Sequence, residues 1–205
     1  MENKSVHQDI ESIRQLMERS VRFVSLSGLS GILAGVYALV GASFAYTQIY
    51  SGEAVRTVTY YQGHFPIVKN LFITAGAVLV ASLATGWWFS LRKSKKLNTK
   101  MWDSTSKRLL VNLGVPLAVG GFFTLILVNY GYYNLVAAAV LLFYGLALIN
   151  ASANLYDEVR YLGYCELVVG VFAALFPGYG LYFWAVGFGL LHILYGSLMY
   201  TKYDR

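Results

Sequence analysis

Long, nearly uncharged apolar runs dominate this sequence, and they follow one another in pairs from Val21 to Tyr200. A helix that crosses the hydrocarbon core of a bilayer needs about 20 mostly apolar residues. Backbone groups in lipid must be hydrogen-bonded within the protein, so helices are expected here rather than the short alternating strands of a β-barrel. The sequence therefore predicts an all-α membrane protein with six transmembrane helices, at residues 23–48, 68–91, 109–129, 133–151, 159–176 and 180–200.

Charged residues are scarce and unevenly placed. They make up 13% of the chain, against about 25% in soluble domains, whereas 57% of the residues are hydrophobic. In a six-span arrangement, 14 of the 16 Lys and Arg residues fall on one side of the membrane, and only Arg56 and Lys69 fall on the other. Because cytoplasmic segments carry such an excess of cations, we expect both termini in the cytoplasm.

A basic stretch connects the second and third apolar runs. Its first cations are expected to contact anionic lipid headgroups; they are Arg92, Lys93, Lys95, Lys96 and Lys100. Membrane topology and attraction to lipid account for the net charge of +6, so nucleic-acid binding is not expected.

Residues 1–21 precede the first run and differ from it in pattern. Ile10, Ile13 and Met17 recur at helical spacing among charged residues, which predicts a cytoplasmic amphipathic helix. Such a helix can lie on the membrane face or pack under the bundle. It can also bind a protein partner, or a second copy of the chain, through its apolar stripe.

The pairing of the runs predicts three helical hairpins, at residues 22–91, 108–151 and 159–201. The second and third hairpins repeat one another, because the tripeptides centred on Tyr144 and Tyr195 match at a shift of 51 positions.

Small residues mark the expected contacts between these helices, since helices in lipid associate through close approach of their backbones. The first run carries Ser27, Gly31 and Gly35 at a spacing of four residues. We expect this stripe to pack against another helix.

Residues 160–200 resemble the repeat unit of the HdeD-like acid-resistance membrane proteins. Glycines on both helices and a proline at the turn carry the resemblance: Gly163, Gly170, Pro177, Gly189 and Gly196. The resemblance implies a bundle of three hairpins in a bacterial inner membrane and a role in acid or envelope stress. It implies no catalytic residues.

Two ionisable residues, Glu166 and His192, fall inside expected spans. Glu166 lies 12 residues before the turn at Gly178 and His192 lies 14 residues after it, so an antiparallel hairpin places them at similar depth. Charges within the bilayer are costly and often functional, and histidine titrates near physiological pH. One interpretation is a proton-responsive pair. The alternative is a satisfied hydrogen bond, or a Glu166 side chain that reaches toward the membrane surface.

His64 is expected on the outer face, in the longest outer loop. It is a second pH-responsive candidate, and a solvated loop histidine is the alternative interpretation.

The sequence contains no motif of nucleophilic catalysis, of nucleotide binding or of metal ligation. An enzyme is therefore not expected, nor are a cofactor or a metal. Two functions remain open. The first is a non-enzymatic membrane component of stress response, which could form a homo-oligomer. The second is a small-solute transporter, a channel, or the substrate-binding membrane subunit of a transporter. A polar cavity at the bilayer midplane would favour the second function, and a tightly packed bundle would favour the first.

Overall fold

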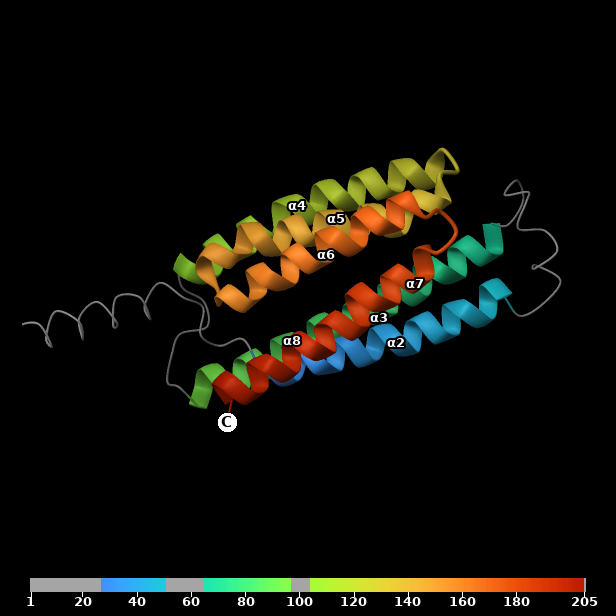
Figure 1. Ribbon diagram of the computed structural model, residues 1–205. Coiled ribbons are helices and arrows are strands. Elements are labelled where there is room, and N and C mark those ends of the chain that lie inside the picture. The colour runs from blue at the N-terminus through green and yellow to red at the C-terminus, as the bar shows by residue number, and fades with distance from the viewer. Residues whose placement is uncertain (1–26, 51–64, 97–103, 205) are drawn as a thin grey trace, which may run out of the picture.

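The computed structural model describes residues 27–50, 65–96 and 104–204, and every regular element in these ranges is a helix (Figure 1). The longer helices are α2 (Gly28–Tyr50), α3 (Phe65–Lys96), α4 (Ser104–Asn129), α5 (Val136–Ala151) and α6 (Asp157–Leu175). The last stretch is a single column built from α7 (Gly180–Trp184), η4 (Ala185–Leu191), α8 (His192–Met199) and η5 (Tyr200–Asp204). The expected N-terminal helix at residues 1–21 lies outside the described residues.

Five of these stretches are long and apolar enough to cross a membrane: Gly28–Ile49, Val68–Lys96, Thr105–Asn129, Tyr133–Ala151 and Gly180–Asp204. Their length and composition agree with the expected class, an all-α membrane protein. Helix α6 is not among them, because Glu158, Arg160 and Glu166 interrupt its apolar run. The sixth span therefore stays a prediction.

The helices form two groups (Figure 1). Helix α5 lies between α4 and α6 in one group, while α2 lies between α3 and the α7–α8 column in the other. The turn at Pro177 and Gly178 carries the chain between the groups, and Gly178 adopts a φ of 100° that favours glycine. Consequently α6 packs mainly against α5, and α8 packs mainly against α2, although α6 and α8 belong to one expected hairpin.

Glycines bring α2 directly against α8 and η4. A Cβ atom added to Gly35 would lie 2.6 Å from the carbonyl oxygen of Gly189, and one added to Gly31 would lie 3.1 Å from the Cα atom of Gly196. The two backbones are thus in contact, as expected for helices that associate in lipid.

Helix α4 contains a proline that its neighbour accommodates. Pro116 has no N–H group to offer to the carbonyl oxygen of Asn112 one turn earlier. The side chain of Asn150 on α5 donates a hydrogen bond to that oxygen at 2.7 Å. The bond takes the place of the helical N–H group that the proline lacks, and it joins the two helices.

The last apolar stretch differs from the regular helix expected for residues 180–200. Two π-helical turns, η4 and η5, flank α8 within it. Such turns are rare and occur often at functional sites.

The basic stretch after the second run also differs from the expected connection, because α3 continues through Arg92 to Lys96. Cations in the last turn of a helix interact favourably with its dipole.

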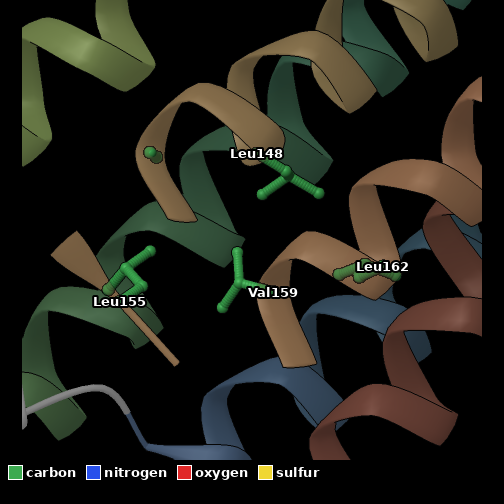
Figure 2. Close-up of a cluster of buried hydrophobic side chains, with 5 residues drawn as sticks. Leu148, Leu155, Val159 and Leu162 are labelled. Atoms are coloured by element: carbon green, nitrogen blue, oxygen red, sulfur yellow. The ribbon is translucent and has the colours of Figure 1, made fainter. Parts of the chain in front are cut away.

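A buried apolar cluster fills one end of the α5–α6 group. Leu148 and Ala151 of α5 meet Leu155, Val159 and Leu162 around the start of α6 (Figure 2). The outward faces are apolar as well, with Val80 and Phe122 about two-thirds exposed. A surface of this kind is suited to lipid.

Two terms describe the ends of the molecule below. The tail end is where α2, α4 and α6 begin and where η5 ends, and the turn end is where the α4–α5 and α6–α7 connections lie (Figure 1).

Candidate functional site

Three polar side chains from three helices meet in the interior of the bundle: Tyr144 of α5, Glu166 of α6 and His192 of α8. The hydroxyl oxygen of Tyr144 lies 2.7 Å from Nε2 of His192, and Oε1 of Glu166 lies 3.5 Å from its Nδ1. Glu166 is fully buried and His192 is 8% exposed. We call this group the buried triad. The two residues that the sequence places at similar depth therefore face each other.

The hydrogen bonds of His192 define its tautomer. Its Nδ1 lies 3.0 Å from the carbonyl oxygen of Gly187, and a carbonyl can only accept, so Nδ1 carries a proton. A positive charge in an apolar interior is costly, which favours the neutral ring. In that form Nε2 accepts the hydrogen bond that the Tyr144 hydroxyl donates.

The Glu166 carboxyl lacks hydrogen bonds of the kind that hold His192. Both of its carboxyl oxygens are buried, and neither has a hydrogen-bond partner. An isolated carboxylate would be strongly disfavoured in such surroundings, so the arrangement favours an uncharged Glu166 beside the neutral imidazole. The site can then bind one further proton, on the imidazole ring.

Gly187 makes room for the Glu166 carboxyl. A Cβ atom at Gly187 would lie 2.6 Å from Oε2 of Glu166 and would also press on Leu141, which is fully buried. The same glycine supplies the carbonyl that holds His192. The π-helical turn η4 therefore contacts both Glu166 and His192 of the triad.

Aromatic rings close the triad toward the turn end. The ring of Phe188 lies 5.0 Å from that of Tyr144 and 5.9 Å from that of His192, measured between centroids. Trp184 follows at 5.3 Å from Phe188. These contacts place an apolar layer on that side.

At the tail end, Asp204 joins η5 to α2 and α3. One carboxylate oxygen of Asp204 accepts hydrogen bonds from the Gly28 backbone N–H, at 2.7 Å, and from the Ser27 hydroxyl, at 3.0 Å. Its other oxygen pairs with the Lys93 ammonium at 2.6 Å. An acidic group at a helix N-terminus satisfies free N–H groups and the helix dipole.

Glu158 makes a second connection at the tail end. Its carboxylate accepts hydrogen bonds from Lys202 and from the Tyr203 hydroxyl, so η5 is joined to the first turn of α6. Glu158 precedes the proposed span at residues 159–176. Burial alone would raise the pKa of this carboxyl, but the hydrogen bonds from Lys202 and Tyr203 outweigh it and hold the pKa below its ordinary value.

The residues expected to contact headgroups have different environments. Lys95 and Lys96 are exposed, and Arg92 lies over the ring of Trp88 at 5.2 Å. Lys93 instead pairs with Asp204 and is only 16% exposed. Lys100 and His64 lie outside the described residues.

The expected packing stripe on α2 has two parts. Gly31 and Gly35 lie against α8 and η4, while Ser27 donates its hydrogen bond to Asp204. In the described ranges, His, Cys, Asp and Glu form no group of three or more that could hold a metal ion.

Sequence reasoning did not assign a role to Tyr144 or Asp204, and it treated Gly187 only as one of the small residues that mark helix packing. A signal for Tyr144 existed, because it matches Tyr195 in the internal repeat and both lie deep in their runs. Nothing in the local pattern links Gly187 to Glu166, or marks Asp204 near the end of the last run.

Comparison with the models of known protein families, with curated proteins and with solved structures gives no match.

Proposed function

We propose that this chain is a non-enzymatic, six-span protein of a bacterial inner membrane that responds to acid through the buried triad. The observation that carries the proposal is Glu166, a fully buried carboxyl without a hydrogen-bond partner that faces an imidazole. Ionisable groups within a membrane domain are rarely kept without a function. The resemblance of residues 160–200 to the HdeD-like proteins supports the same assignment to acid stress.

The proposed topology comprises three hairpins with both termini in the cytoplasm. Helix α6 has 19 residues, which gives a length of about 28 Å, close to the thickness of the hydrocarbon core. It lies along α5, which is itself apolar enough to span a membrane. These features support α6 as the remaining span.

The triad lies between the two helix groups, so its charge affects how they pack. At neutral pH, Glu166 and His192 carry no net charge together. One further proton gives an imidazolium beside an uncharged carboxyl, and this leaves a positive charge without a counterion in the interior. Acid therefore weakens the packing of α6 of one group against η4 and α8 of the other.

Transport of a small solute is the second candidate. It is favoured by the π-helical turn η4, which interrupts the last stretch directly before His192. Interrupted helices often form substrate and ion sites in transporters. A solute-dependent flux into vesicles that the triad variants abolish would favour this candidate.

The acid response can be measured by hydrogen exchange of the protein in lipid vesicles across a pH series. We expect exchange in α6, η4 and α8 to rise cooperatively on acidification. His192→Phe should abolish the rise, and the isosteric Glu166→Gln should displace its midpoint. Asp157→Asn removes an exposed carboxyl from the same helix and should leave the transition unchanged. If both triad variants respond to pH as the wild type does, the proposal is wrong.

A further inference from the structure

Polar side chains continue from the buried triad toward the tail end. Tyr195 lies one turn beyond His192 on α8, and its hydroxyl oxygen is buried without a hydrogen-bond partner. A buried hydroxyl normally has a partner, since leaving it without one costs free energy. Tyr195 therefore needs an explanation that packing alone does not provide.

Tyr195 lies between the triad and the surface. Its ring packs against the apolar cluster of Figure 2, as does the ring of Tyr144. The hydroxyl is near enough to Tyr144, and to Glu158 and Tyr203 at the tail end, for a charge on one of these groups to disfavour a charge on the tyrosine. Hydroxyl groups both donate and accept hydrogen bonds, so a tyrosine at this position can pass a proton along.

The polar series reaches solvent at Glu158. The Tyr203 hydroxyl donates to the Glu158 carboxylate at 3.1 Å, and the neighbouring Lys202 side chain is 60% exposed. The ring of Tyr203 stacks on Tyr156 at 4.1 Å, which holds it against the start of α6. The carboxylate thus lies between water and the interior hydroxyls.

On the turn-end side of the triad, the part of the chain that the structure describes shows no such series. Phe188 and Trp184 cover this side, and Phe183 follows against Phe176 at the turn, with 6.5 Å between those two rings. Aromatic rings without hydroxyls cannot relay a proton. The described surroundings of the triad are therefore asymmetric, with rings that carry no hydroxyl packed on the turn-end side.

We propose that protons reach His192 from the tail end only, along a path that runs from Glu158 and Tyr203 through Tyr195 to Tyr144. Water molecules bridge the hydroxyls along this path. Tyr144 gives its hydroxyl proton to Nε2 of His192 and takes one from water on its Tyr195 side. Tyr195 gives and takes in the same way, so that one proton moves from solvent to the imidazole and each tyrosine stays neutral.

The charged groups around this path are few. Helix α5 presents Tyr144, helix α6 presents Glu166 and Glu158, and the last column presents His192, Tyr195 and the tail-end residues. Helix α2, which packs on α8, contains no Asp, Glu, Lys, Arg or His. Besides His192 and Lys202, these elements carry one basic side chain, Arg160 of α6, which is exposed and donates a hydrogen bond to the Ser152 hydroxyl.

The test uses the single cysteine as a reporter. Cys165 is exposed and adjoins Glu166, so an environment-sensitive fluorophore attached to it reports the state of the triad. In rapid acid jumps on protein in lipid vesicles, Tyr195→Phe should slow the fluorescence change by roughly 10²-fold, the typical contribution of one positioned proton-transfer group. The equilibrium midpoint should not change, which a merely structural role of the hydroxyl would not predict. Tyr182→Phe, near the turn end of the same column, should leave both quantities unchanged.

A second test asks from which face of the membrane the protons arrive. A tag is fused after residue 205, and an external protease can remove it only from protein whose tag faces outward. Cleavage therefore distinguishes the two orientations of the protein in the vesicles. A jump applied to the face that carries the tag should give the fast response, and a jump applied to the other face should not.

This inference rests on the proposed function, but the two fail differently. If the Glu166→Gln and His192→Phe variants both show the same equilibrium response to pH as the wild type, the proposed function is wrong. A normal equilibrium response combined with an unchanged rate in Tyr195→Phe, or with a fast response from the other face, overturns the path alone.

Discussion

Gly187 leaves the space that the Glu166 carboxyl occupies in the buried triad. A Cβ atom at Gly187 would lie 2.6 Å from Oε2 of Glu166, whereas one at Gly114 would meet nothing within 4 Å. We expect Gly187→Ala to cost about 1–3 kcal/mol through overpacking. Gly114→Ala should be neutral or slightly stabilising, since alanine favours the helix by about 1 kcal/mol. Thermal unfolding in detergent compares them, and equal stability of the two variants would contradict the close contact.

The contact between Glu166 and His192 could be predicted only in part from the sequence. Intramembrane charge singled out Glu166 and His192, and counting residues from the turn placed them at one depth. Their contact depends on the rotation of two helices about their axes, which spacing along the chain does not determine. The hydroxyl of Tyr144 and the carbonyl of Gly187 become parts of the site only through that rotation.

At the scale of elements, α4 and α5 are joined by the bond from Asn150 to the carbonyl of Asn112. We expect Asn150→Leu to lower the free energy of unfolding by about 1 kcal/mol, as is typical for a lost hydrogen bond. In a Pro116→Ala background the same change should cost much less, because residue 116 then supplies the missing N–H group. Denaturant unfolding of the four proteins in detergent measures this cycle. An equal cost in both backgrounds would refute this explanation.

The elements themselves follow from hydrophobic length, and the helices α2 to α5 lie close to the expected runs. The π-helical turns η4 and η5 were not expected, because an extra residue in a helical turn leaves the apolar composition unchanged. The association of α2 with α8 was not expected either. The glycine stripe of α2 marks a packing face, but it does not name the partner.

At the scale of the whole molecule, η5 connects the two helix groups through Glu158. The pKa of this carboxyl is lowered in the folded protein. Its contribution to stability is therefore complete above the ordinary pKa of a glutamate, and it is lost as the pH falls through the lowered value. Glu158→Gln should be less stable than the wild type at neutral pH and should lose less stability on acidification. Thermal unfolding across a pH series provides the measurement.

The effect of Glu158→Gln on stability can be compared in a Lys202→Met background, which lacks the ammonium that pairs with Glu158. There Glu158→Gln should have a smaller effect at neutral pH. An undiminished effect would assign the stabilisation to Tyr203 or to other neighbours.

The glycine contact between α2 and α8 also sets an order of events during synthesis. Gly28 and its partner Gly196 are separated by most of the chain. At ~5–20 residues per second, α2 waits on the order of ten seconds before its counterpart leaves the ribosome. Throughout that interval its glycine face is covered by lipid or by the insertion machinery. Helix α2 thus reaches its final neighbour late, and a nascent chain halted before α8 would hold that helix unmatched.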